Sequence, residues 1–154
     1  MNIRKYNEND NNEIYKLFYD TVHSVNIKDY NLEQVNVWAK ENINIQKWCE
    51  KFKNSYTLIA EENENIVGFS NIDPDGYFDM LYVHKNFQDK EVAKTLLNNI
   101  EKYSIENNIN SIITYSSITA KSFFEKMGFK TLENNIVIRD NIELPNYLMA
   151  KEIG

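Results

Sequence analysis

The spacing of apolar residues changes from a helical to a strand period near residue 55. Before this point, apolar residues recur at intervals of three and four, which predicts a helix capped by Asp10, a shorter helix capped by Asn31 and a third helical piece. The apolar positions of these helices are Ile14, Leu17, Phe18, Val22 and Val25, then Leu32, Val35 and Trp38 on one face, and finally Ile45, Trp48, Cys49 and Phe52. Residues 2–6 are expected to form a short first strand.

After residue 55 the apolar residues follow the strand period of two. SYTLIAEE, IVGFSNI and YFDMLYV predict three strands, and EENEN and Asp73-Pro74-Asp75-Gly76 supply turns, so an antiparallel meander is expected. A helix over about 89–107, a strand at 111–115 and a helix ending at Gly128 come next, because glycine is a typical helix stop. TLENNIVIR and IELPNYLMAKEI predict two last strands. This order indicates an α+β fold, a layered sheet with helices on its faces.

The composition of the chain argues against several classes of function. A chain of 154 residues without a Pro/Gly/Ser-rich linker predicts a single domain, residues 1–154. The net charge is −6 and no basic block of five residues occurs, which argues against a nucleic-acid partner. No apolar run approaches the roughly 18 residues of a membrane span, and the N-terminus lacks a secretory signal. Cys49 cannot form an internal disulfide, and the two histidines show no metal-ligand spacing, so a cytoplasmic protein without a metal site is expected.

Two segments carry candidate chemistry. In YFDMLYVHKNFQDKEVAKTLL a strand ends near Val83 and a helix begins near Asp89, and the unpaired N–H groups of a first helical turn bind phosphate well. Lys90 and Lys94 add positive charge to the same turn. In SSITAKSFFEKMGF, Ser117 is expected to cap a helix. Either segment alone also fits an ordinary helix packed on a sheet, because every helix has an N-terminus and most bind nothing.

Together, the order and separation of these segments resemble the acetyl-CoA-dependent N-acetyltransferases of the GNAT superfamily. In that family a strand leads into Gln/Arg-x-x-Gly-x-Gly/Ala, and Gln88-Asp89-Lys90-Glu91-Val92-Ala93 stands in that place after Leu81-Tyr82-Val83. A later family pattern, Asn-x-x-Ala-x-x-Phe/Leu-Tyr-x-x-x-Gly-Phe, falls on Ser117, Ala120, Phe123, Phe124, Gly128 and Phe129. The ending IELPNYLMAKEI is similar to the family's last strand. The resemblance covers nearly the whole chain and implies a GNAT-like acyl-CoA N-acyltransferase fold, with a mixed central sheet of about seven strands flanked by helices.

The resemblance also implies residue roles. The backbone of Leu81 and Val83 would pair with the pantetheine arm of acetyl-CoA, in a gap where two parallel strands splay apart. Backbone N–H groups from 89–93 would hold the pyrophosphate, Ser117 would lie beside the pantetheine, and Ala120 would let the cofactor pass close to its helix. The cofactor-binding residues implied in this way are Leu81, Tyr82, Val83, Gln88, Asp89, Lys90, Glu91, Val92, Ala93, Lys94, Ser117, Ala120 and Phe124.

Two residues depart from the family pattern. Glu91 stands where the family usually has a glycine, which can take a positive φ and approach phosphates without a Cβ. The Glu91 side chain is therefore expected to turn out to solvent. Phe124 stands where the family commonly has a tyrosine that protonates the departing CoA thiolate. Ser116, Ser117, Tyr115 or a water could replace that donor, and a thiol of pKa about 8.5 also leaves tolerably well unaided.

The attacking amine must lose a proton, and Asp79 is the first candidate to accept it. A carboxylate partly buried among apolar neighbours has a raised pKa, which suits a base. An Asp at a strand end that simply faces water is an equally good interpretation. His84 has a suitable intrinsic pKa but falls in a polar loop, and His23 is more commonly read as a solvated helical residue.

Three functions remain open at this point. The leading hypothesis is an N-acetyltransferase that moves acetyl from acetyl-CoA to a small-molecule or peptide amine, with residues of about 20–45 walling the acceptor site. The second is a CoA-binding module with weakened or lost catalysis, which Glu91 and Phe124 favour. The third is a scaffold without cofactor. The sequence does not identify the amine, and a homodimer is expected only because twofold dimers are common.

Overall fold

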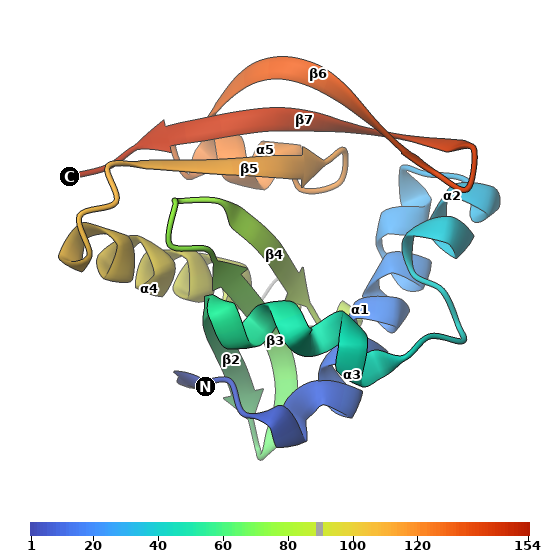
Figure 1. The fold of residues 1–154 in the computed structure, drawn as a ribbon, viewed down its shortest axis with the longest axis horizontal. Helices are drawn as coiled ribbons and strands as arrows, with labels where there is room; N and C mark the ends of the chain where they lie inside the picture. The colour runs from blue at the N-terminus through green and yellow to red at the C-terminus, as the bar shows by residue number, and fades with distance from the viewer. Residues whose placement is uncertain (89–90) are drawn as a thin grey trace.

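The computed structural model of the protein describes residues 1–88 and 91–154, and its seven strands form two sheets (Figure 1). The first sheet, in the order β1-β2-β3-β4, is antiparallel, and the second has the order β5-β7-β6. The strands are β1 (Asn2–Lys5), β2 (Tyr56–Glu62), β3 (Asn65–Ile72), β4 (Phe78–Val83), β5 (Ser111–Ser117), β6 (Lys130–Arg139) and β7 (Ile142–Glu152). The α-helices are α1 (Asn11–Ser24), α2 (Leu32–Trp38), α3 (Ile45–Trp48), α4 (Val92–Glu106) and α5 (Lys121–Lys126). This arrangement confirms the predicted α+β fold.

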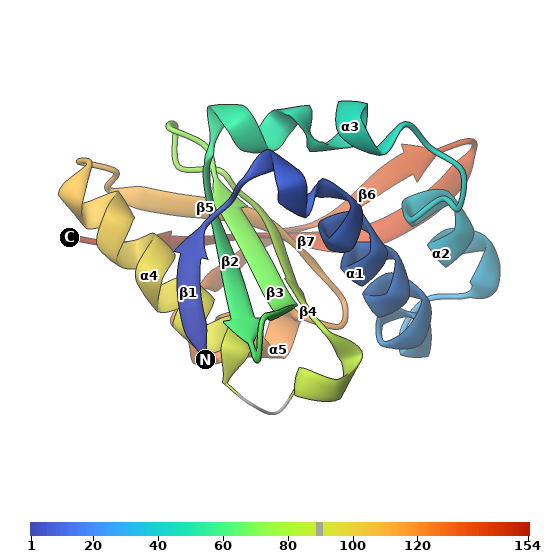
Figure 2. The ribbon, with the colours of Figure 1, turned by 90° about the horizontal axis from the view of Figure 1, so that it is seen from below.

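Helices cover both faces of the first sheet (Figure 2). The apolar stripe of α4 packs on one face, where Leu96, Leu97 and Ile100 are fully buried. The opposite face packs against α1, α3 and the 3-10 turn η3 (Cys49–Asn54), with Ile14 and Phe52 buried. The 3.6-residue spacing read from the sequence therefore identified the core face of α1.

The prediction that Asp10 caps the first helix is wrong. Asp10 precedes α1 but makes no side-chain cap hydrogen bond to it. Its carboxylate instead accepts hydrogen bonds from Arg4 at 2.9 and 2.8 Å and from the Asn7 N–H at 2.9 Å. Burial would raise the pKa of Asp10, but these donors outweigh it and hold the pKa below its usual value. A nearly buried carboxylate is stabilised more by a guanidinium than by a single backbone N–H. Asp10 therefore bonds Arg4 and does not cap α1.

The second helix begins as predicted, but one of the three residues of its predicted apolar face is exposed. Asn31 and Gln34 form a reciprocal capping box, each side chain accepting from the other's backbone N–H at 2.8 Å. Val35 is fully buried, whereas Leu32 is 63% exposed and does not share its face. The Gln34 side chain also donates to the Glu143 carbonyl of β7 at 2.8 Å, so this short helix is fixed to the β6–β7 hairpin.

Strands β4 and β5 touch only at their beginnings. Tyr77 and Ile113 form an isolated parallel bridge, and the Ile113 N–H donates to the Gly76 carbonyl at 3.0 Å. Gly76 has a φ of +95°, and a Cβ on it would lie 2.5 Å from the Ser111 carbonyl oxygen, so glycine is needed for this close approach. Beyond the Thr114 Oγ1 to Phe78 carbonyl bond at 2.9 Å, the structure assigns no further pairing between the described residues of these two strands. The strands therefore diverge toward their carboxyl ends.

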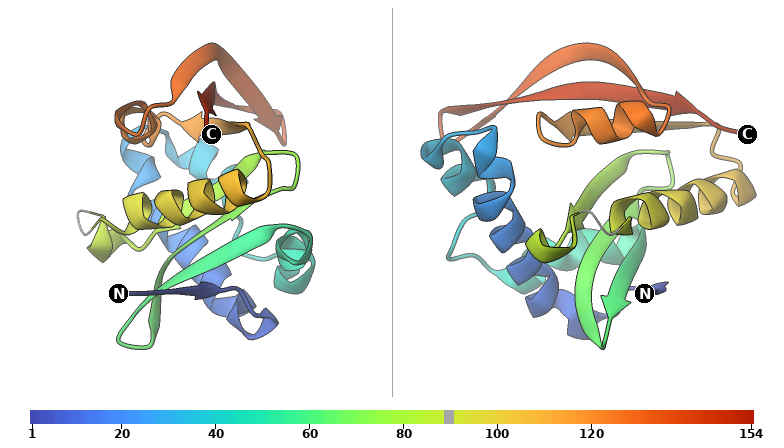
Figure 3. Two further views of the ribbon diagram at one scale, coloured as in Figure 1. Left: turned by 90° about the vertical axis from the view of Figure 1, so that its left-hand side faces the viewer. Right: turned by 180° about the vertical axis from the view of Figure 1, so that it is seen from behind.

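The second sheet is covered on one face by α5 (Figure 3). This helix ends before Gly128, whose φ is +96°, as the predicted glycine stop requires. On the other side of the molecule, the long β6–β7 hairpin reaches α2. None of the helices in the described parts of the chain has the length and apolar content needed to cross a membrane.

Candidate functional site

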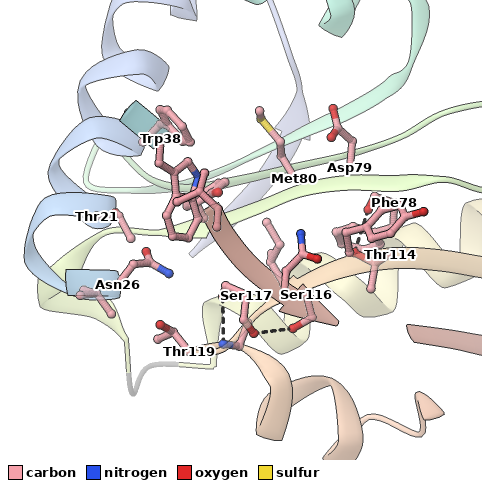
Figure 4. A pocket seen from close by; sticks show the side chains of 18 of the residues that line it. Thr21, Asn26, Trp38, Phe78, Asp79, Met80, Thr114, Ser116, Ser117 and Thr119 are labelled. Atoms are coloured by element: carbon pink, nitrogen blue, oxygen red, sulfur yellow. Dashed lines mark hydrogen bonds between the residues drawn. The ribbon is translucent and has the colours of Figure 1, made fainter. Parts of the chain in front are cut away.

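The gap between β4 and β5 opens into a cleft of about 470 Å³ (Figure 4). On one side it is lined by β4, β5 and the start of α5, and on the other by α1, α2, η3 and the tip of the β6–β7 hairpin. Nine of the residues predicted for the site line this cleft: Asp79, Leu81, Tyr82, Val83, Gln88, Ala93, Ser117, Ala120 and Phe124.

Asp79 enters the cleft through a β-bulge in β4. The register pairs Phe78 with Ile72 and Met80 with Asn71, so Asp79 is the extra residue. A bulge re-aims side chains, and Asp79 and Met80 point to the same side of the strand in Figure 4. The Met80 N–H is satisfied by the Asn71 side chain at 3.0 Å, which stabilises the bulge. Asp79 is half-buried and lines the cleft, so it is not a strand-end residue that simply faces bulk water.

The carboxyl end of β4 directs backbone groups into the gap. The His84 N–H bonds the Val67 carbonyl of β3, and in an antiparallel ladder alternate residues then face the same way. Leu81 and Val83 therefore point their N–H and C=O groups away from β3. The Val83 carbonyl already accepts from Thr21 Oγ1 at 3.1 Å and from the Gln88 side chain at 2.5 Å. The Leu81 groups and the Val83 N–H are left facing the gap.

The turn before α4 has the backbone conformation that a glycine would favour. Glu91 has a φ of 61° and a ψ of 17°, in the left-handed region, and its exposed side chain confirms the expected turn to solvent. Its carbonyl accepts from the Thr95 N–H at 3.0 Å and so begins the helix. Val92 is in the core and Lys94 is exposed, and neither side chain lines the cleft. Asp89 and Lys90 lie outside the described residues.

The three hydroxyl residues proposed to replace a missing proton donor differ in their hydrogen bonds. Ser117 Oγ accepts the Ala120 N–H at 3.0 Å and keeps its own O–H for another acceptor. Ser116 Oγ already donates to the Ser117 carbonyl at 2.9 Å, and Tyr115 is 43% exposed. The neighbouring Thr119 Oγ1 is buried and has no hydrogen-bond partner among the described residues. The Ser117–Ala120 turn thus presents two hydroxyls to the cleft.

Phe124 and the two histidines have mainly structural surroundings. Phe124 is 3% exposed and packs edge-on against the rings of Phe78 and Phe129 at 6.0 and 5.1 Å, while one side lines the cleft. His23 Nε2 bonds the Ala39 carbonyl at 2.9 Å, and His84 Nδ1 accepts the Asn86 N–H at 3.0 Å. Neither histidine lines the cleft, so neither is a candidate base here.

Sequence reasoning missed several residues of the cleft, among them four that can carry charge: Tyr30, Lys51, Tyr77 and Arg139. Burial lowers the pKa of the Lys51 ammonium, and the charge of Asp79 partly opposes this shift. Burial and the nearby Asp79 carboxylate raise the pKa of Tyr77. These residues come from a helical turn, a loop and a strand end that are far apart in sequence, and no local pattern marks them.

Comparisons with known proteins agree with this geometry. A family model described as an acetyltransferase (GNAT) domain matches residues 26–151. The uncharacterized N-acetyltransferase YafP of Escherichia coli (strain K12) is 33% identical over 138 residues, 89% of this chain and 86% of that protein. A GCN5-related N-acetyltransferase structure from Rhodopseudomonas palustris is 28% identical, with a TM-score of 0.94 over 99% of this chain and 95% of that one. The PaiA N-acetyltransferase of Thermoplasma acidophilum, solved with coenzyme A, shares the fold at 20% identity and a TM-score of 0.81, each chain covered to 98%.

Proposed function

The chain belongs to the GNAT family of N-acetyltransferases, and we propose that it moves an acetyl group from acetyl-CoA directly to an amine bound in the same cleft. The observation that carries this proposal is the single cleft between the diverging strands β4 and β5. It is lined by the residues that match the family's cofactor motifs and also by residues of α1, α2 and the β6–β7 hairpin. One cavity lined by both sets of residues would bring the two reacting groups together, which direct transfer requires.

The cleft has unfilled hydrogen-bonding groups suited to the pantetheine arm of the cofactor. The Leu81 backbone and the Val83 N–H face the gap, as a further strand would need. The Thr119 hydroxyl is buried and has no partner within residues 1–88 and 91–154. Buried polar groups normally have one, so a ligand that bonds it would complete the site. Acetyl-CoA, when bound, supplies an acyl thioester that an amine can attack.

The start of α4 suits the pyrophosphate. The first-turn N–H groups of a helix of 15 residues favour an anion, and Glu91 gives the turn the left-handed conformation that the family reaches with glycine. The exposed Glu91 carboxylate does not line the cleft, so its charge is kept out of the cavity. The departure from the family pattern therefore changes the residue but keeps the backbone conformation.

Asp79 is the residue that we assign as proton acceptor. The amine nitrogen forms a bond to the acetyl carbon, the carbon–sulfur bond breaks, and the ammonium proton passes to the Asp79 carboxylate. The Ser117 O–H is free to donate a hydrogen bond to the departing sulfur, which offsets the lack of a hydroxyl on Phe124. General-base assistance contributes about 10²–10⁴-fold, so Asp79→Asn is expected to lower kcat by that order with little change in acetyl-CoA affinity.

Calorimetric titration with acetyl-CoA tests the cofactor site. Wild type is expected to bind at micromolar concentration, and Ala120→Leu to lose binding, because a larger side chain would enter the cleft. Ser122→Leu on the exposed side of α5 is the matched control and should bind as wild type does. If Ala120→Leu bound acetyl-CoA with the affinity of wild type, the assignment of this cleft as the cofactor site would be contradicted.

A CoA-binding module without catalysis is the second candidate, and Phe124 is the observation that favours it. Thiol release from acetyl-CoA in the presence of a panel of amines separates the two. Binding without amine-dependent thiol release would support the module, whereas release that falls in Asp79→Asn supports the enzyme.

A further inference from the structure

The charged residues of the cleft lie outside the segments that match the family's cofactor motifs. Of the described residues that line the cleft, three carry a formal charge: Lys51, Asp79 and Arg139. Two of these three are cations, although the whole chain has a net charge of −6. The family's cofactor motifs contribute neither cation, since Lys51 comes from η3 and Arg139 ends β6.

Lys51 is a half-buried cation without a neutralising contact. Its Nζ lies 4.5 Å from the centre of the Trp48 ring. None of the ion pairs within 4.0 Å among the described residues includes it, whereas its neighbour Lys53 pairs with Glu8 at 2.8 Å. Burial lowers its pKa, and the charges of Asp79 and Asp73 act on it from beyond contact distance. A cation removed from water is normally paired with an anion. The Lys51 ammonium has no such partner among the described residues, so it is available to an anionic ligand.

Arg139 lines the same side of the cleft as Lys51, at the end of β6. The acidic residue beside it in sequence, Asp140, pairs instead with Lys40 at 2.6 Å. Arg139 has no ion pair among the described residues, and its positive charge adds to burial in lowering the pKa of Lys51. Both cations therefore line one cleft and have no ion pair among the described residues, which leaves both available to one anionic ligand.

The rest of this wall is apolar and aromatic. The side chains of Trp38, Trp48 and Leu144 line the cleft together with Tyr30 and Phe18. Trp38 and Tyr30 pack edge to face with ring centres 5.0 Å apart, and Phe18 and Trp48 lie 4.8 Å apart. Such a wall favours a ligand with a hydrophobic or aromatic body over a highly hydrated one.

We propose that the acceptor is a small amine that also carries a carboxylate on an apolar body, as an aromatic or aliphatic amino acid does. The amine faces the Asp79 carboxylate and the acceptor's carboxylate lies between Lys51 and Arg139. Two cations and one carboxylate on the protein thus complement one amine and one carboxylate on the ligand. A polyamine, by contrast, would place further positive charge against Lys51 and Arg139. This inference rests on the proposed acetyl transfer and specifies its substrate class.

A matched pair of acceptors tests the proposal. L-phenylalanine and L-phenylalaninamide have the same body and amine, but the amide lacks the carboxylate. With acetyl-CoA and thiol release as the readout, kcat/KM is expected to be at least about tenfold higher for the acid, because hydrogen bonds to charged groups are the strong ones. Leucine and leucinamide form a second pair, and spermidine represents the opposite charge class.

Substitutions then assign the preference to residues. Lys51→Met keeps an apolar contact with Trp48 and removes the charge, and it is expected to reduce the acid-to-amide ratio to below about threefold, chiefly through KM. Lys53→Met, two residues away and paired with Glu8, should keep the ratio of wild type. A direct measurement without turnover uses N-acetyl-L-phenylalanine, which should bind the protein–CoA complex in calorimetry and bind Lys51→Met at least about tenfold more weakly.

Each contrary result has a distinct meaning. Equal or better use of the amides, preference for spermidine, or no binding of N-acetyl-L-phenylalanine to a protein that does bind acetyl-CoA would overturn this inference and leave the proposed transfer standing. A protein that fails to bind acetyl-CoA at all would overturn the proposed function, and the inference with it.

Discussion

Tyr30 joins three segments of the site through one hydroxyl, and its removal should be felt both in stability and in cofactor affinity. The Tyr30 O–H donates to the Pro145 carbonyl of β7 at 2.6 Å and accepts the Ile118 N–H at 3.0 Å. The residue is 7% exposed, and burial raises its pKa, so the phenol is protonated at neutral pH. The loop between α1 and α2 is thereby tied to the β6–β7 hairpin and to the turn that follows Ser117.

In Tyr30→Phe both hydrogen bonds are lost while the ring can keep its packing against Trp38. Each bond contributes about 1 kcal/mol, and the stranded Ile118 N–H adds a desolvation cost, so the expected loss is about 2–3 kcal/mol. For a chain of this size that corresponds to a fall in Tm of about 4–12 °C. The KM for acetyl-CoA should rise as well, because the Ile118 amide no longer fixes the turn that carries Ser117.

Equilibrium urea unfolding measures the first effect, and the midpoint should fall with an unchanged slope. Tyr103→Phe is the matched control, since its ring stacks on Tyr56 at 3.8 Å and its hydroxyl makes no hydrogen bond within the described residues. A loss in Tyr30→Phe below about 0.5 kcal/mol, or one equal to that of Tyr103→Phe, would refute the reasoning.

Three further predictions concern the backbone and one ion pair. Glu91→Gly should melt about 2–4 °C above Glu91→Ala, because a Cβ at a φ of 61° costs about 1 kcal/mol; equal melting temperatures would show that the turn is unstrained. Gly68→Ala should lose about 1–3 kcal/mol in urea unfolding, since its Cβ would lie 2.8 Å from Val92 Cγ1 at the start of α4, whereas Gly154→Ala, with nothing within 4 Å, should not. Wild type should have a larger free energy of unfolding than Asp10→Asn at any pH above the ordinary aspartate pKa of about 3.9. This difference should disappear as the pH falls through the lower pKa that Asp10 has in the folded protein. A difference that persists at about pH 2 would argue against the ion pair.

The parts of the fold that follow from local spacing could be predicted from the sequence. The apolar faces of α1 and α4, the Asn31 cap and the glycine stop at Gly128 depend on neighbours within a turn or two. The Asp10 cap was predicted wrongly because its real partner, Arg4, lies on β1, outside the local pattern. The exposed side of a two-turn helix such as α2 is equally hard to assign, since few apolar positions define its faces.

The residues of the candidate site also fall into two groups, those that a local motif predicts and those that only the folded chain brings to the cleft. Residues in continuous motifs, such as Leu81–Val83 and Ser117–Ala120, could be found because their spacing resembles a family pattern. Lys51 and Arg139 could not, because their places in the cleft depend on how the turn after α3 and the tip of the β6–β7 hairpin pack in the fold. The family pattern has a glycine at position 91, which indicates a turn that can take a positive φ. Only the structure shows that Glu91 itself adopts the left-handed conformation.

The Val83 carbonyl oxygen has a consequence for how two substrates could sense each other. It accepts one hydrogen bond from Thr21 on α1 and another from Gln88, which precedes α4. Any displacement of this one atom must change the geometry of both bonds together. If a ligand at either end of the cleft shifts this atom, we expect the two ligands to bind with a reciprocal coupling, each changing the affinity of the protein for the other by the same factor.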